Sequence, residues 1–227
     1  MSTIRLEHVS VFHRDVRSKT AVAALFDVSL EIADGLMTVV QGPSGCGKTT
    51  LLKVISGVLA ADEGALYKDS VDITTDPPDK RGVAYVTQEH TPYPHLTVFE
   101  NIAFPLRQSG APVEEIRRRV NAIAHDLDIS PLLSRKPRVL SKGQQQVLAL
   151  ARAIVKRPDV ILLDEPFASL DPLRRTHIKT RLRDMQRRGG LTVVLVTHDD
   201  DDASELADVI VTMDNGSVTG THRRQNT

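Results

Sequence analysis

The chain has 227 residues, which is enough for one ordinary domain or for one domain with an inserted subdomain. Its 29 basic and 29 acidic residues cancel, so there is no general electrostatic case for nucleic acid as a partner. Tryptophan is absent and only 4% of the residues are aromatic, which leaves little surface on which bases could stack. No apolar run is long enough to span a bilayer, and the N-terminus lacks the apolar core of a signal peptide, so we expect a soluble, cytoplasmic protein.

Apolar patterns along the chain predict strands at 4–9, 28–32, 37–40, 82–88, 160–163 and 192–197. In the first two, apolar and polar residues alternate, as in strands with one solvent-exposed face. Helical patterns follow at 50–55, from 98 to about 157, including 114–127 and a stretch from 142 that Pro158 ends, and from about 173 to 188. This order predicts one α/β domain over residues 1–220. Its core covers about 1–88 and 158–220, a helical insert covers about 89–157, and 221–227 form a flexible tail.

Residues 42–49 spell the phosphate-binding pattern G-x-x-x-x-G-K-[ST] between a buried strand and a helix, the context that the motif requires. Glycine torsions let successive N–H groups face a phosphate, and the helix start adds partial positive charge. We expect Lys48 to reach the β- and γ-phosphates of ATP and Thr49 to ligate the bridging Mg²⁺. A glycine turn beside a surface lysine is the weaker alternative. The predicted ATP contacts in this loop are Gly42, Pro43, Ser44, Gly45, Cys46, Gly47, Lys48, Thr49 and Thr50.

Cys46 is the only cysteine, so no internal disulfide can form and a reducing compartment is the simple inference. At a helix start its thiol could be acidified and reactive. A small residue that fills space in the loop is the favoured alternative.

Two acids, Asp164 and Glu165, follow the apolar strand at 160–163 and therefore lie at the carboxyl edge of the sheet, where α/β folds bind ligands. Phosphoryl transfer needs a metal to neutralise charge and an acceptor to orient the attacking water. We expect Asp164 to hold Mg²⁺, directly or through water, and Glu165 to polarise the water. Two solvated acids at a strand end are the alternative, which the neighbouring phosphate loop disfavours.

Three further motifs read Leu-Ser-Lys-Gly-Gln-Gln-Gln at 140–146, Ser-Leu-Asp at 169–171 and Thr-His-Asp at 197–199. A plain helix N-cap would explain Ser141 but not the glutamines. With the phosphate loop and the acidic pair, in this order, the motifs resemble the nucleotide-binding subunit of an ATP-binding cassette (ABC) transporter over essentially the whole chain. The resemblance implies a P-loop NTPase core with an N-terminal antiparallel β subdomain and an inserted α-helical subdomain.

The resemblance also implies roles for residues outside the phosphate loop. Gln88 matches the glutamine that senses the metal and the γ-phosphate, and His198 matches the switch histidine that contacts the γ-phosphate. The residues that match contacts to the ATP of an opposite subunit are Ser141, Lys142, Gly143, Gln144 and Asp171. A head-to-tail homodimer, or a heterodimer with a similar subunit, would then enclose two ATP molecules.

Some positions depart from the family pattern. Lys142 stands where glycine is common, and its backbone N–H is retained unless a positive φ is required there. Val147 replaces a common arginine. The aromatic residue that usually stacks on adenine aligns with His13, with Phe12 one residue earlier as the alternative. The acids at 199–202 point in different directions on a helix, so we expect a helix start rather than a metal cluster.

Residues 93–106 resemble the segment after the glutamine in bacterial importers of sugars and related solutes, where a coupling helix of the membrane subunit docks. An internal helix face is the alternative for their apolar content. The resemblance implies two transmembrane permease subunits, an extracytoplasmic solute-binding protein, and a peripheral place at the cytoplasmic face of the inner membrane. An exporter or lipid-handling ATPase, or a soluble ABC ATPase, remain alternatives. Sugar importers usually continue into a C-terminal regulatory domain, which is either naturally lacking here or has been removed.

Overall fold

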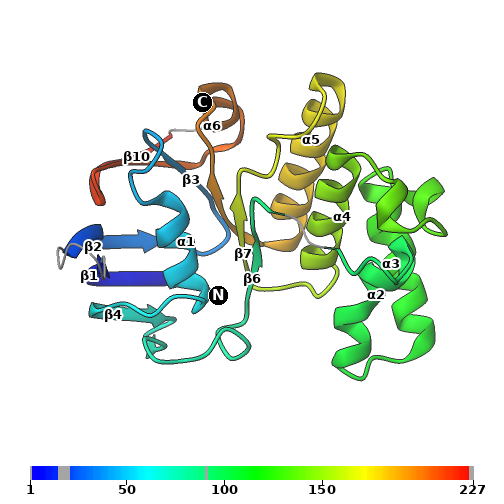
Figure 1. The fold of residues 1–227 in the computed structure, drawn as a ribbon, viewed down its shortest axis with the longest axis horizontal. Helices are drawn as coiled ribbons and strands as arrows, with labels where there is room; N and C mark the ends of the chain where they lie inside the picture. The colour runs from blue at the N-terminus through cyan, green and yellow to red at the C-terminus, as the bar shows by residue number, and fades with distance from the viewer. Residues whose placement is uncertain (1, 15–20, 90–91, 225–227) are drawn as a thin grey trace. The chain divides into compact units, whose positions relative to one another are not determined.

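The computed structural model describes residues 2–14, 21–89 and 92–224 (Figure 1). The chain forms two compact units. The first comprises Met1–Tyr85, Asp159–Glu165 and Gln186–Thr227, and the second comprises Val86–Pro158 and Pro166–Met185. The expected helical insert ended near residue 157, whereas the second unit also contains Pro166–Met185.

The first unit contains a four-stranded antiparallel sheet near the N-terminus, in the order β2-β1-β4-β5. Its strands are β1 (Ile4–Arg14), β2 (Ala21–Ile32), β4 (Glu63–Lys68) and β5 (Val71–Asp72). One face of β1 and β2 is apolar and buried, including Ile4, Leu6 and Leu30. This sheet confirms the predicted antiparallel β subdomain.

A second sheet has six strands in the order β10-β9-β3-β8-β7-β6. They are β3 (Met37–Gln41), β6 (Val83–Val86), β7 (Val160–Asp164), β8 (Thr192–Val196), β9 (Val209–Asp214) and β10 (Ser217–Arg223). Strands β3, β7, β8 and β9 are parallel. The near-continuous apolar content of β3, β7 and β8 suits their burial on both faces. The carboxyl ends of β3, β7 and β8 therefore meet at one edge of the sheet.

Helix α1 (Lys48–Ser56) packs into the hydrophobic core that the two sheets of this unit share, and α6 (Asp200–Leu206) follows β8 (Figure 1). The Arg81 guanidinium donates to the carbonyls of Val54 and Ile55 in the last turn of α1, at 2.7 and 3.2 Å. A cation there satisfies carbonyls that have no partner within the helix and opposes the negative end of its dipole.

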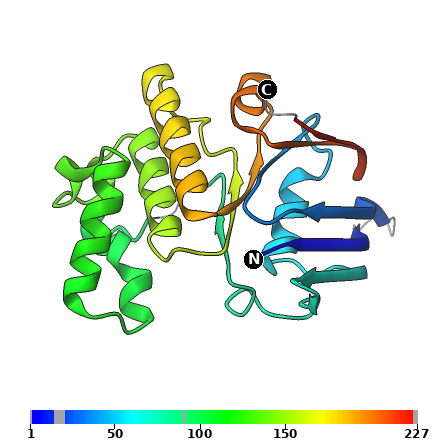
Figure 2. The same ribbon diagram turned by 180° about the vertical axis from the view of Figure 1, so that it is seen from behind.

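The second unit is helical, with α2, α3 and α4 packed side by side (Figures 1 and 2). It contains α2 (Val98–Gln108), α3 (Val113–Asp126), α4 (Lys142–Ile154), α5 (Pro172–Gly189) and 3₁₀ turns at Ser130–Leu132 and Pro137–Val139. The boundary between the two units falls inside the last turns of α5. Within the described residues, every helix is too short or too polar to serve as a bilayer span.

The C-terminal end differs from the expected flexible tail. Residues 221–223 belong to β10, and the N–H of Arg224 donates to the carbonyl of Asp208 at 2.9 Å. Pairing with β9 orders these residues, because their backbone groups have ladder partners. Residues 225–227 lie outside the described part of the chain.

Candidate functional site

The phosphate loop connects β3 to α1, which begins at Lys48. Gly47, just before the helix, has a φ of 103°, and a Cβ there would lie 2.5 Å from the carbonyl oxygen of Ala24. A Cβ at Gly42 would lie 2.2 Å from the carbonyl oxygen of Met213. The loop thus packs against the backbones of β2 and β9 so closely that both positions require glycine. Thr49 and Thr50 occupy the first turn of α1 and are half-buried.

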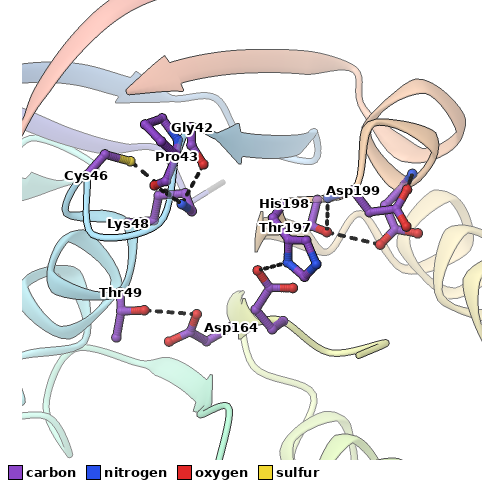
Figure 3. A network of polar contacts seen from close by, with 11 residues as sticks. Gly42, Pro43, Cys46, Lys48, Thr49, Asp164, Thr197, His198 and Asp199 are labelled. Carbon is purple, nitrogen blue, oxygen red and sulfur yellow. Dashed lines mark hydrogen bonds and ion pairs between the residues drawn. The ribbon is translucent and has the colours of Figure 1, made fainter. Parts of the chain in front are cut away.

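Lys48 points back into this loop (Figure 3). Its ammonium donates to the carbonyls of Gly42 and Pro43, each at 2.8 Å, and the residue is only 8% exposed. The contacts hold a positive charge beside the start of α1, where the helix dipole is also positive. This arrangement favours an anion such as a phosphate group.

Cys46 belongs to the hydrophobic core cluster and is 3% exposed. Its sulfur lies 3.7 Å from the Lys48 ammonium. The burial agrees with the favoured alternative, a residue that fills space beneath the loop, because a reactive thiol has to be accessible.

Asp164, the last residue of β7, is 2% exposed and accepts hydrogen bonds on both carboxylate oxygens. The Thr49 hydroxyl donates to Oδ1 at 3.2 Å, as Figure 3 shows, and the Tyr85 hydroxyl donates to Oδ2 at 3.2 Å. Burial and the neighbouring carboxylate raise the pKa of Tyr85, so its phenol stays protonated and remains a donor. The structure therefore brings Thr49 and Asp164 together, as the two predicted metal ligands require.

Glu165 follows directly and adopts a φ of 50°, unusual for a residue with a side chain. Its N–H donates to the carbonyl of Val196 at 3.0 Å, which fixes this turn to the end of β8. Its Oε1 lies 2.8 Å from Nδ1 of His198. This hydrogen bond and the carboxylate charge raise the pKa of His198, whose side chain is 73% exposed while that of Glu165 is 14% exposed. Glu165 and His198, predicted from separate motifs, thus form one pair.

The acids at 199–202 begin α6. The Asp199 carboxylate accepts from the N–H groups of Asp201 and Asp202 at 2.9 and 3.4 Å, as an N-cap does. Asp202 is 2% exposed and accepts from the Thr197 hydroxyl at 3.1 Å. These contacts agree with the expected helix start.

In the second unit, Ser141 caps α4 and forms a capping box with Gln144, with donor–acceptor distances of 3.2 and 3.0 Å. Lys142 is the exposed first residue of this helix and does not adopt a positive φ, so its N–H is retained as expected. Val147, at the position of the missing arginine, is buried in the helical unit.

Gly143 and Gln146 connect α4 to residues 169–171. A Cβ at Gly143 would lie 2.8 Å from the carbonyl oxygen of Ser169, so glycine permits this close approach. The buried Gln146 amide oxygen accepts from the Ser169 N–H at 3.1 Å. Asp171 is exposed, and its carboxylate accepts from the N–H of Arg174 at 3.0 Å in the first turn of α5. Two predicted motifs therefore form one structural group within the second unit.

The remaining predicted residues lie on strands or loops. Gln88 is exposed in a bend after β6 and belongs to the second unit. His13 is exposed and lies opposite Val22 in the β1–β2 pair, whereas Phe12 is half-buried opposite Ala23. Because cross-strand partners share a face, His13 and Val22 form a small exposed platform. This favours His13 over Phe12 as the stacking residue.

Several side chains of the segment at 93–106 make contacts within the second unit. The Tyr93 ring lies between the Arg152 guanidinium, 4.6 Å from its centroid, and Phe104, at a centroid distance of 4.6 Å. Asn101 is fully buried and makes four hydrogen bonds to backbone groups of Tyr93, Leu96 and Thr97. A groove of about 420 Å³ lies beside this segment and is lined by Phe99, Arg107, Ala111, Val113, Ile116 and Arg117. Tyr93 and Phe104 therefore serve internal packing, whereas Phe99 contributes to the groove.

Sequence reasoning missed Tyr85, Asn101 and Gln146 as parts of these arrangements. Tyr85 was part of a predicted strand without any sign that its hydroxyl meets Asp164. The glutamines of 144–146 were noted as unexplained by a plain cap, and this was the available signal for Gln146.

Comparisons with known proteins agree with this geometry. The family model described as "ABC transporter" matches residues 25–168. The lactose transport ATP-binding protein LacK of Rhizobium radiobacter is 43% identical over 90% of this chain and 56% of its own length. The maltose/maltodextrin import ATP-binding protein MalK of Escherichia coli is 40% identical over 96% of this chain and 57% of its own length. The chain spans a little over half the length of these relatives.

Among solved structures, the dimeric ABC transporter cassette MJ0796 matches with a TM-score of 0.91 and 30% identity, over 99% of this chain and 100% of that chain. A post-hydrolysis state of the same cassette, bound to ADP and Pi, matches with a TM-score of 0.90. The phosphate loop, the acidic end of β7 and the capped helix α4 thus belong to a fold that extends over the whole of a known cassette. On these grounds the chain belongs to the ABC transporter family.

Proposed function

We propose that the protein is the ATP-hydrolysing subunit of an ABC transporter that powers the import of a solute. The observation that carries this proposal is the group formed in the first unit by Lys48, Thr49, Asp164, Glu165 and His198. It combines a phosphate cradle, two oxygen ligands for a metal and a carboxylate beside a histidine. The names of LacK and MalK support transport of a sugar.

The chemistry of the proposed metal ligands suits Mg²⁺. The Thr49 hydroxyl and the Asp164 carboxylate are hard oxygen donors 3.2 Å apart, and Gln88 is a further proposed ligand. Bound Mg²⁺ would neutralise charge on the ATP phosphates. Lys48 would bind the β- and γ-phosphates, Glu165 would orient the attacking water, and His198 would hold the Glu165 carboxylate and contact the γ-phosphate.

The site is proposed to be completed by a second copy of the chain. Ser141, Gly143 and Asp171 would contact the γ-phosphate side of an ATP bound to the partner, and the capped start of α4 offers N–H groups for it. The dimeric state of the MJ0796 cassette supports a dimer here. Two permease subunits and a solute-binding protein are proposed as the other components.

A soluble ABC ATPase and an exporter subunit are the competing functions. Recovery of the chain with polytopic membrane proteins supports a transporter, and recovery with ribosomes or DNA contradicts it. Among transporters, accumulation of a solute inside cells that depends on this chain separates import from export.

The test of the catalytic assignment is Glu165→Gln. We expect this variant to bind ATP as the wild type does and to lose nearly all hydrolysis, because an amide cannot accept a proton from the attacking water. ATP binding and phosphate release measure the two properties separately. Glu31→Gln, which neutralises an exposed acid on β2, is the matched control and should hydrolyse ATP normally. Full turnover by Glu165→Gln would refute the role given to Glu165.

A further inference from the structure

The hydroxyl of the half-buried Tyr85 contacts Asp164, one of the proposed metal ligands. Tyr85 is on β6, which neighbours β7 in the six-stranded sheet, and Asp164 is the last residue of β7. The phenol oxygen is 3.2 Å from Oδ2 of Asp164. Tyr85 and Asp164 are 79 residues apart in sequence, so the sheet alone brings them together.

The two oxygens of Asp164 accept from different donors. Tyr85 donates to Oδ2, and Thr49 donates to Oδ1 from the first turn of α1. An aspartate side chain rotates about two bonds, and two donors at fixed positions select one orientation of its carboxylate. That orientation turns Oδ1 toward Thr49, the other proposed metal ligand.

A hydroxyl has one proton and two lone pairs, so Thr49 can donate to Oδ1 and still offer a lone pair to a cation. Tyr85 is not one of the proposed metal ligands. Its hydrogen bond to Oδ2 leaves Oδ1 as the oxygen that faces Thr49. Outer partners of this kind orient metal ligands and commonly affect metal affinity.

From this geometry we propose that Tyr85 is a positioning residue that orients the Asp164 carboxylate for binding the metal of the metal–ATP complex. The proposal rests on the proposed role of Asp164 as a metal ligand. It adds a residue that touches neither the nucleotide nor the metal and acts through Asp164.

The test is Tyr85→Phe, which removes the hydroxyl and keeps the ring. It is introduced together with Glu165→Gln, so that ATP is not consumed, and Mn²⁺ replaces Mg²⁺ as a spectroscopic probe. With protein in excess over ATP, electron paramagnetic resonance of free Mn²⁺ gives the metal affinity of the ATP-bound protein. We expect Tyr85→Phe to weaken Mn²⁺ binding by about tenfold, at the lower end of the range for outer partners of a metal ligand. ATP affinity in EDTA should stay unchanged.

Tyr67→Phe on β4 is the matched control, since it removes a phenol hydroxyl in the same unit, where the ring faces Arg5. It should leave Mn²⁺ affinity unchanged. Thermal unfolding without nucleotide distinguishes a merely structural role. If the hydroxyl only stabilised the fold, Tyr85→Phe would lower the melting temperature and leave the Mn²⁺ affinity intact. Unchanged Mn²⁺ affinity in Tyr85→Phe would overturn the positioning role.

Asp164→Asn separates this inference from the proposed function. If Asp164→Asn weakens Mn²⁺ binding and Tyr85→Phe does not, Asp164 is a metal ligand and the role of Tyr85 is wrong. If neither substitution changes Mn²⁺ affinity, the proposed metal role of Asp164 is wrong as well.

Discussion

The pairing of Glu165 with His198 joins the residue after β7 to the second residue after β8. The carboxylate lies 2.8 Å from the imidazole and stabilises its protonated form. Asp199 also raises the pKa of His198, whereas burial and Lys48 lower it. The charges of Glu165, Asp199 and Lys48 therefore all influence the pKa of the exposed His198 imidazole.

Removing the charge of Glu165 should lower the pKa of His198. In Glu165→Gln without nucleotide, we expect this pKa to fall toward the ordinary histidine value of about 6.5, measured by NMR titration of the ring protons. The pKa of His198 is higher in the folded protein than in the unfolded chain. The pair therefore contributes its full stability at a pH below the unfolded-state pKa, and this contribution is lost as the pH rises through the folded-state pKa. The stability difference between wild type and variant should therefore shrink as pH rises. An unchanged His198 titration would contradict the pairing.

At the level of single residues, local motifs made much of the site predictable. Fixed spacing in 42–49 predicted the phosphate loop, and a strand end predicted the place of Asp164 and Glu165. The contact between Tyr85 and Asp164 could not be predicted in this way, because it depends on which strands are neighbours in the sheet. The same holds for Gln146 and Ser169, which meet only after α4 and the segment before α5 have packed.

Among the secondary-structure elements, the strongest apolar patterns were assigned correctly. Strands β3, β7 and β8 agree with the predicted strands to within a residue at each end. Strands β4, β5, β9 and β10 were not predicted. β5 has only two residues, both exposed, β4 has Leu66 as its one buried residue, and β10 is an edge strand without a buried residue, so their apolar signals are weak. Pro105 lies inside α2 and does not end it, which agrees with the helical pattern predicted from residue 98 onward.

Gly143→Ala tests the group formed by α4 and residues 169–171. The added Cβ would lie 2.8 Å from the Ser169 carbonyl oxygen and 3.2 Å from a Leu170 methyl carbon, so the two segments have to move apart. We expect a loss of stability of about 1–3 kcal/mol, as for overpacking of a close contact, measured by denaturant unfolding. ATP binding to the loop in the first unit should persist.

Gly189→Ala is its matched control, since Gly189 is also helical and a Cβ there meets nothing within 4 Å. Equal stability of the two variants would show that the close approach at Gly143 is not a constraint.

At the scale of the whole molecule, the residues proposed to act on ATP are divided between the two units. The phosphate loop, Asp164, Glu165 and His198 belong to the first unit, and Gln88, helix α4 and Asp171 belong to the second. Asp171 belongs to the same unit as α4, because the Ser169 N–H donates to the Gln146 side chain and Gly143 permits the close approach of this segment. In the proposed dimer, residues of the second unit of one copy would contact the ATP that is bound to the first unit of the other copy.

The most direct test of this account is the mass of Glu165→Gln in solution, measured by light scattering after size exclusion, with and without ATP. We predict a monomer without nucleotide and a dimer with ATP, because ATP that is not hydrolysed would join the phosphate loop of one copy to the start of α4 in the other. Adding Ser141→Arg should abolish the dimer and leave ATP binding intact. A Glu165→Gln protein that binds ATP and stays monomeric, or a dimer that is insensitive to Ser141→Arg, would contradict the composite site.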